Sequence, residues 1–376
     1  DMAAPRLQKF GERFTMESCI HKGAYTSFKE LSDHAYRGNV QDPSSGTPAG
    51  KKARRIIQSD GVLSLFNSKE KRNMAIANEI FKFLKKYCVY PPANAFNLPE
   101  FYETYPYNTN DPIVQLGLNR FQQYLADMSM EGFIEMYSLP DCTPKFQSGT
   151  NPDYYYSIEE SVVILNRLLR FQFEDDEEQI FKFLTNLWQV INRECPKLNT
   201  FILVSILSSA GKNYFLNPFL AIQLNVGVIP DLTREAGRFA LDNLHGRRAA
   251  EWNEPYYEDD KFNMLKKVLG GDPFPTELKH KEKVIIQRLP VFIMANAVPD
   301  FARSGYFRDR IVMYTWVECP FLKEYTKYPH PLATIELFKQ WSIGIFSSNK
   351  TNLFIVFYYL MELQFLYIYQ IQSKPY

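Results

Sequence analysis

Three neighbouring residues, Gly211, Lys212 and Asn213, stand where this sequence could hold phosphate groups. They follow a nearly continuous apolar run at residues 200–204, which is typical of a strand buried in a parallel sheet. A P-loop consists of a strand, the pattern G-x-x-x-x-G-K-[ST] and a helix, so that backbone amides and the lysine surround phosphate. Here Ile206 occupies the first glycine position and Asn213 the hydroxyl position. Taken alone, these residues are more typical of an ordinary helix start.

Polar residues at later strand ends change that interpretation. Glu254 lies 42 residues after Lys212, and Asn296 lies 42 residues after Glu254. An acid at the end of a neighbouring strand is where an ATPase holds magnesium and orients the attacking water. An amide that ends the apolar run 291–295 is placed to sense the γ-phosphate. Arg310 follows, in a place that makes it available to a neighbouring subunit's nucleotide as an arginine finger.

The order of these residues resembles that of the superfamily three helicases, and most closely those of insect parvoviruses, the densoviruses. The matching motifs lie at residues 210–215, 252–255, 270–272 with the loop 279–281, and 290–296. Each motif is short, but their order and spacing are specific as a set. The resemblance covers roughly residues 155–320.

The resemblance implies a role for each matching residue. Gly211, Lys212 and Asn213 would bind the phosphates of ATP, and Asn213 with Glu254 would hold Mg²⁺. Glu254 would be the Walker B acid, Asn296 the sensor, and Arg310 the finger acting in trans. Lys279 and Lys281 would lie on a hairpin that contacts the DNA backbone in a central channel.

The resemblance also implies an architecture and a setting. The fold would be α/β, an AAA+-like P-loop ATPase sheet with helices on both faces, preceded by a mostly α-helical region. Such proteins form homo-oligomers, typically hexameric rings, on single-stranded or duplex DNA, and a virus of this kind replicates in the host nucleus. The expected divisions are a helical region at 1–150, a helical oligomerisation collar at 151–196, the helicase at 197–320 and an apolar helical extension at 321–376.

Two residues depart from this family pattern. Ile206 replaces a glycine that can adopt positive φ and let phosphate approach, which a β-branched residue does badly. Glu251 interrupts an expected apolar strand, and a buried carboxylate is costly. The alternative function is therefore a catalytically impaired remnant that oligomerises or binds DNA.

A small P-loop kinase is a third interpretation. Such an enzyme has little use for a lysine-bearing hairpin or for an arginine that acts in trans.

The periodicity of the sequence places the elements around the motifs. Helical stripes are expected at 68–88 and from about 112 to 125, with residues 94–110 as a connector. Ser157 and Glu160 form a capping box at the start of one helix, and a second begins after the acidic run 174–178. Their apolar stripes need a partner, either within the chain or in another subunit. Strands are expected at 200–204, 226–229, before 252, 284–286, 291–295 and 310–316, with a helix at 259–269.

Composition excludes few classes of protein. Of 376 residues, 45% are hydrophobic and 23% charged, which is ordinary for a globular chain, and the net charge of +1 gives no global signal for nucleic acid. The five cysteines include no C-x-x-C pair, so a zinc site or disulfide framework is not expected. No two of the five histidines form the His-x-His pair that the family's nuclease requires, so origin nicking is not assigned.

Both ends of the sequence are unusual. It begins at Asp1 rather than Met, consistent with a fragment, and a basic run at 51–55 fits a nuclear import signal, a phosphate contact or a solvated surface cluster. Residues 353–371 are almost all apolar, but a membrane span there is the weaker reading because polar residues interrupt them. A truncated start, an altered P-loop and a foreign tail suggest a viral gene copy resident in a host genome.

Overall fold

A five-stranded parallel sheet is the framework that positions the site. The computed structural model describes residues 68–147, 151, 153–235, 239–277 and 283–347, within the compact unit Phe66–Tyr376. The strands are β1 (Thr200–Val204), β2 (Val226–Val228), β3 (Ala249–Asn253), β6 (Val291–Ala295) and β7 (Ile311–Thr315). Their order is β2-β3-β6-β1-β7, and every pairing in this sheet is parallel. The carboxyl ends of β1, β3 and β6 therefore meet at one edge of the sheet.

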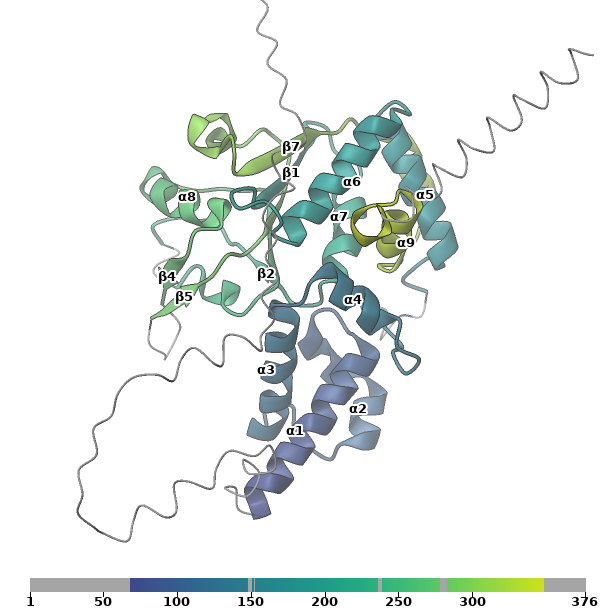
Figure 1. Cartoon of the computed structure of the whole chain (residues 1–376), viewed down its shortest axis with the longest axis vertical. Helices are drawn as coiled ribbons and strands as arrows, with labels where there is room; N and C mark the ends of the chain where they lie inside the picture. The colour runs from purple at the N-terminus through teal and green to yellow at the C-terminus, as the bar shows by residue number, and fades with distance from the viewer. Residues whose placement is uncertain (1–67, 148–150, 152, 236–238, 278–282, 348–376) are drawn as a thin grey trace, which may run out of the picture. The chain divides into compact units, whose positions relative to one another are not determined.

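Helices cover both faces of this sheet, as Figure 1 shows. Because successive strand residues point to opposite faces, Phe201 and Leu203 join one apolar cluster while Ile202 and Val204 join another. The first cluster contains α6 (Glu177–Ile191) and α7 (Lys212–Ala221), and the second contains α8 (Phe262–Gly270). The predicted α/β class with helices on both faces is confirmed.

Phe183 on α6 lies at the centre of the apolar cluster on the α6 and α7 side of the sheet. Its ring contacts Phe201 of β1 and Phe215 of α7, with centroids 5.3 and 5.4 Å apart, and Tyr314 of β7 at 4.9 Å. Phe183 is fully buried, and aromatic pairs of this kind add to the free energy gained by burial. This contact holds α7, and therefore the P-loop, against β1.

The helices predicted as a collar bury their apolar stripes inside their own chain. The capping box forms at the start of α5 (Ile158–Gln172): Glu160 N donates to Ser157 Oγ and Ser157 N to Glu160 Oε2, both at 3.1 Å. α5 packs against α9 (Ala333–Gln340), and α6 packs against β1. An in-chain core thus accounts for both stripes, and the role of these helices in oligomerisation stays a prediction.

The N-terminal part of the described chain is helical, as expected. It contains α1 (Ser68–Tyr87), α2 (Pro99–Thr104), α3 (Pro112–Ala126) and α4 (Met130–Tyr137). The interpretation of residues 94–110 as a plain connector was wrong, because a 3-10 helix at Pro92–Asn97 and α2 occupy much of it. Each starts at a proline whose fixed φ suits the first helical position, a signal that the Pro- and Tyr-rich composition concealed.

One apolar cluster runs from α1 to the segment after α9, so the helical region and the sheet share a core. The proposed boundaries at 150 and 196 stay predictions. Residues 1–67, which include the basic run, and the apolar tail 348–376 lie outside the described residues. Among the helices that are described, none has the length and apolar character needed to cross a membrane.

A two-stranded antiparallel hairpin follows α8. It consists of β4 (Phe274–Thr276) and β5 (Val284–Ile286), paired from Phe274 with Ile286 to Thr276 with Val284. Lys279 and Lys281 fall between these strands, at residues 278–282, and lie outside the described residues. The placement of both lysines on a hairpin that contacts DNA stays a prediction.

Arg288 fixes the entry to β1. Its guanidinium donates to the carbonyl oxygens of Arg193, Cys195 and Leu198 and to Asn199 Oδ1. Asn199 is fully buried and in turn donates to the carbonyl oxygens of Val268 and Leu289. The Arg288 side chain therefore holds the segment before β1 against the segment before β6.

We predict that Arg288→Ala lowers the free energy of unfolding by about 2–4 kcal/mol, because it leaves several half-buried carbonyl oxygens without a donor. Urea unfolding followed by circular dichroism measures this. The matched control is Arg303→Ala, whose side chain is 70% exposed and which should change stability by no more than about 0.5 kcal/mol. Equal effects of the two substitutions would contradict the role given to Arg288.

Candidate nucleotide site

A cavity of about 430 Å³ opens at the carboxyl ends of β1, β3 and β6. Ligands of open parallel sheets bind in such crevices. Its lining comes from the P-loop and the start of α7, from the ends of β3 and β6, and from the segment after β7. These residues are Ser208, Ser209, Ala210, Gly211, Lys212, Asn213, Tyr214, Asn253, Glu254, Asn296, Leu322 and Lys323.

The P-loop turns through two residues with left-handed backbone conformations. Ser209 has a φ of 62° and Gly211 a φ of 89°, and Gly211 is the residue that precedes α7. A Cβ atom at Gly211 would lie 2.8 Å from Leu322 Cδ1 and 3.0 Å from a methyl group of Leu168. Glycine is therefore favoured at 211 by its backbone conformation, and a Cβ atom there would also require the two leucine side chains to shift. The turn aims the amino end of α7, with its free amides, into the cavity.

Lys212, Asn296 and Glu254 form a connected polar chain across three strand ends. Lys212 Nζ donates to Asn296 Oδ1 at 2.8 Å and to the carbonyl oxygen of Ser205 at 3.3 Å. The backbone amide of Asn296 donates to Glu254 Oε2 at 3.1 Å. Sequence positions spaced 42 residues apart thus meet within hydrogen-bonding distance, because β6 lies between β1 and β3.

Lys212 brings a largely buried cation to the cavity. The side chain is only 8% exposed, and this burial lowers its pKa, while the nearby negative charge of Glu254 acts in the opposite direction. A buried ammonium that is only partly compensated attracts an anion. The site therefore favours a ligand that carries negative charge, such as a polyphosphate.

Ile206 does not occlude this cavity. Its side chain is 79% exposed, it is absent from the cavity lining, and its φ is not positive. The left-handed conformation falls on Ser209 instead, so glycine is not needed at position 206. The steric argument for an impaired site, that Ile206 blocks phosphate, does not hold in this conformation.

Arg310 lies away from the cavity. Its carbonyl oxygen accepts from Thr200 N, at the amino end of β1, whereas the P-loop follows the carboxyl end. Its guanidinium donates to the carbonyl oxygen of Lys266 and pairs with Asp272 at 3.3 Å. Within one chain Arg310 cannot reach a nucleotide in the cavity, so its predicted role in trans is untested.

Sequence reasoning missed the wall formed by Tyr214, Leu322 and Lys323. Tyr214 is half-buried, and its hydroxyl donates to the carbonyl oxygen of Lys327 at 2.9 Å. Leu322 and Lys323 arrive from about 110 residues further along the chain, in a segment without a motif. Only the tertiary fold brings them to the P-loop, where Leu322 gives the cavity an apolar contact suited to a base.

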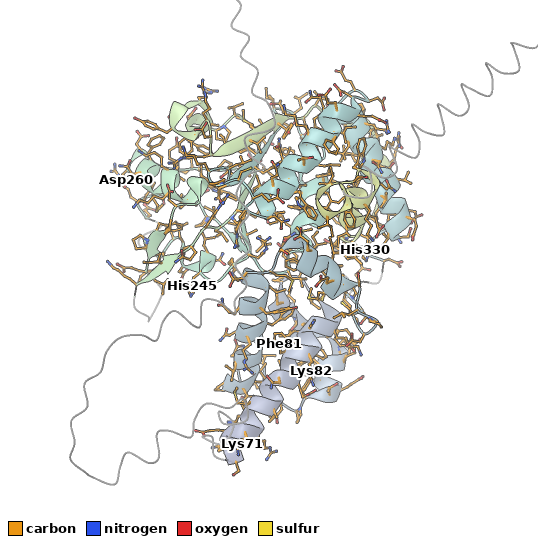
Figure 2. The ribbon with its side chains drawn as sticks, viewed as in Figure 1. Lys71, Phe81, Lys82, His245, Asp260 and His330 are labelled. Carbon is orange, nitrogen blue, oxygen red and sulfur yellow. The ribbon has the colours of Figure 1, made fainter. Side chains whose placement is uncertain are left out.

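The described residues hold no cluster of three or more histidine, cysteine, aspartate or glutamate side chains that could bind a metal. Of the five histidines, His245 and His330 lie in the described part of the chain, and Figure 2 shows them on separate parts of the molecule. They do not form a paired-histidine site with each other.

Sequence comparison finds relatives of this chain among known proteins. The chain is 34% identical over 273 residues to the initiator protein NS1 of Junonia coenia densovirus, which covers 69% of this chain and 49% of the relative. The chain is a homologue of the densovirus initiator proteins. That of Diatraea saccharalis densovirus is 33% identical over the same length, and that of Bombyx mori densovirus is 37% identical over 195 residues, 50% of this chain and 22% of the relative.

This chain spans about half the length of the first two densovirus relatives. No family model matches it. Among solved structures, JCV helicase aligns over 60% of this chain and 66% of its own, with 11% identity and a TM-score of 0.42. The NrS-1 C-terminal region aligns over 48% and 43%, with 16% identity and a TM-score of 0.33. The homology to densovirus initiator proteins rests on sequence identity. The description of the fold rests on the sheet order.

We predict that Gly211→Ala destabilises the protein by about 1–3 kcal/mol, because alanine at positive φ is strained and its Cβ meets Leu322. Gly305→Ala is the matched control, since a Cβ atom there meets nothing within 4 Å and its φ is not positive. Thermal and urea unfolding of both variants measures the difference. A Gly211→Ala protein as stable as the control would contradict the strained geometry of this loop.

Proposed function

We propose that this chain is an ATP-dependent DNA helicase that acts in viral DNA replication. The observation that carries the proposal is the chain of contacts from Lys212 through Asn296 to Glu254 in one cavity at the carboxyl edge of the sheet. Homology to the densovirus initiator proteins supports it. Ile206, one of the two departures behind the alternative of a remnant without turnover, is exposed and does not line the cavity.

Each residue has a definite task in this proposal. The amides at the start of α7 and the ammonium of Lys212 bind the β- and γ-phosphates. Glu254, which is exposed at the cavity, accepts a proton from the attacking water or orients it. Asn296 is hydrogen-bonded to both Lys212 and Glu254. A shift of Asn296 when the γ-phosphate binds would therefore change the positions of both side chains.

The oxygen atoms at the cavity suit Mg²⁺. Asn213 and Asn253 offer amide oxygens and Glu254 a carboxylate, and all three side chains are exposed and line the cavity. Hard oxygen ligands supplemented by water and phosphate are what Mg²⁺ prefers. When bound, the ion would neutralise charge that develops on the phosphates. Asn213 would supply the oxygen that a serine or threonine hydroxyl supplies in the common P-loop pattern.

We predict that Lys212→Ala abolishes ATP binding, whereas Glu254→Gln retains binding but lowers turnover about 10²–10⁴-fold, as expected for loss of a general base. Binding of a fluorescent ATP analogue and phosphate release, with and without single-stranded DNA, distinguish the two effects in the full chain.

Ile206→Gly is the control for the altered loop. We expect it to change turnover little, because the Ile206 side chain lies outside the cavity. Turnover that is absent from the natural sequence but appears in Ile206→Gly would show a disabled helicase. Folded protein without turnover in either form would favour the non-catalytic remnant.

The DNA partner, the ring and the nuclear location are part of the same proposal. The β4–β5 hairpin would carry Lys279 and Lys281 to the DNA backbone, and subunits would assemble as a homo-oligomer, a hexamer in the simplest case, in the host nucleus. In such a ring Arg310 would act on the nucleotide of the adjacent subunit.

We predict that Lys279→Ala and Lys281→Ala each weaken DNA binding about equally for all sequences and reduce the slope of log affinity against log salt by about 1. ATP-analogue binding should be unchanged. Lys283→Ala is the control, because Lys283 directly precedes β5 and already pairs with Glu277. Fluorescence anisotropy at several salt concentrations gives both quantities, and an unchanged slope would remove these lysines from the DNA interface.

A further inference from the structure

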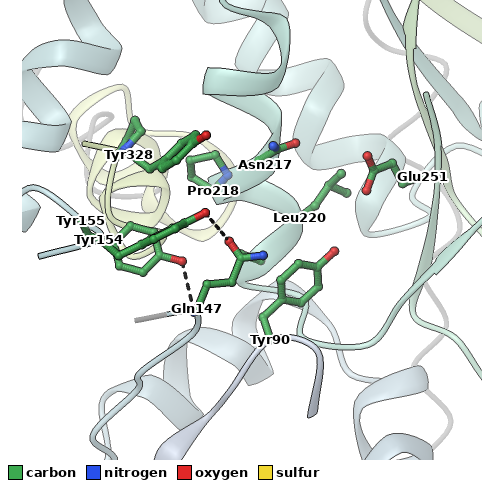
Figure 3. A pocket seen from close by; sticks show the side chains of 11 residues that line it. Tyr90, Gln147, Tyr154, Tyr155, Asn217, Pro218, Leu220, Glu251 and Tyr328 are labelled. Carbon is green, nitrogen blue, oxygen red and sulfur yellow. Dashed lines mark hydrogen bonds between the residues drawn. The ribbon is translucent and has the colours of Figure 1, made fainter. Parts of the chain in front are cut away.

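A second cavity, of about 200 Å³, lies against the later half of α7, separate from the nucleotide cavity. Four tyrosines, two amides and one carboxylate make most of its wall, as Figure 3 shows. These are Tyr90, Gln147, Tyr154, Tyr155, Asn217, Glu251 and Tyr328. The cavity is polar on one side and aromatic on the other. The proposed ATPase activity gives this lining no role.

The aromatic side of the cavity is fixed by its own contacts. The Tyr154 hydroxyl donates to Gln147 Oε1 at 3.0 Å, and Gln147 N donates to the Tyr155 hydroxyl at 3.2 Å. The rings of Tyr154 and Tyr328 stack with centroids 5.0 Å apart, and Tyr155 meets Tyr154 edge to face at 4.7 Å. This wall is preorganised, because its hydroxyls and rings constrain one another.

Glu251 and Tyr90 form the other side of the cavity (Figure 3). Glu251 lies in the middle of β3, and burial raises the pKa of its carboxyl group. No side chain in the described part of the chain donates a hydrogen bond to this carboxylate. The guanidinium of Arg247 donates to Asn243 and Asn225 instead. Burial, and secondarily the charge of Glu251, raises the pKa of the Tyr90 hydroxyl, which therefore stays neutral.

We propose that this cavity binds an organic ammonium group, a protonated primary amine on an aliphatic stem. A half-buried carboxylate without a donor favours a cation, and an ammonium has three donors to share among acceptors such as Glu251, Tyr90 and Asn217. Tyrosine rings attract cations and cover an aliphatic stem. The cavity is smaller than the usual range for drug-sized ligands, so it suits one such group.

Two sources can supply this chemistry, a free amine and the lysine side chain of a polypeptide. The probe for the first is n-butylammonium, and the probe for the second is lysine with both backbone ends capped. Neutral n-butanol has the same stem without the charge. Isothermal titration of each probe into the full chain measures binding, and the ATPase readouts are independent of it.

We expect n-butylammonium to bind and n-butanol not to bind. Glu251→Gln, which keeps the shape of the side chain but removes its charge, should weaken amine binding at least about tenfold. Glu178→Gln is the matched control, an exposed carboxylate at the start of α6 that should leave binding unchanged. If Glu251→Gln fails to fold, Tyr90→Phe carries the test, because it removes one acceptor and keeps the ring.

Binding of both amine probes supports a site open to a polypeptide's lysine, and binding of n-butylammonium alone supports a site for free amines. Binding of neither overturns the proposal and leaves a water-filled polar cavity. Equal binding to the parent and to Glu251→Gln, or equal binding of n-butanol, also overturns it.

Discussion

The burial of one charged side chain constrains the parallel sheet and the helix that follows its first strand. Lys212 has an 8% exposed side chain, so its ammonium needs oxygen partners close by. The sheet supplies them from two different strand ends, Ser205 after β1 and Asn296 after β6. The strand order, the packing of Phe183 against α7 and the Arg288 contacts at the start of β1 all serve to keep these oxygens in register.

Much of this fold was predictable because its signals are local. The apolar runs of β1 and β6, the capping box of α5 and the glycine that ends α8 each act over a few residues. The prediction of a connector at residues 94–110 was wrong, because proline can also begin a helix, as Pro92 and Pro99 do. The polar chain of the site was inferred from motif order and then found assembled. Its apolar wall was not, because Leu322 reaches the P-loop only through the fold.

The P-loop pattern alone did not predict the consequence of having isoleucine at position 206. A pattern states which residue is usual at a position, but the backbone conformation decides whether that residue is necessary. Here the left-handed turn lies at Ser209 and Gly211, so Ile206 keeps ordinary φ and faces solvent. The same α7 that begins at this turn forms part of both cavities, the candidate nucleotide site at its amino end and the tyrosine-lined cavity further along.

The position of Arg310 has a consequence for any assembly of this chain. Its guanidinium is held in its own subunit by Asp272 and the Lys266 carbonyl oxygen, and its side chain is 29% exposed. Hydrogen bonds to a charged group contribute about 1.5–3 kcal/mol, so an extended Arg310 would be a minor conformer, roughly 1–10% of the population. An adjacent nucleotide would have to select that conformer. The contacts of Arg310 with Asp272 and Lys266 would therefore weaken any interaction of Arg310 with a second subunit by the free energy needed to break them.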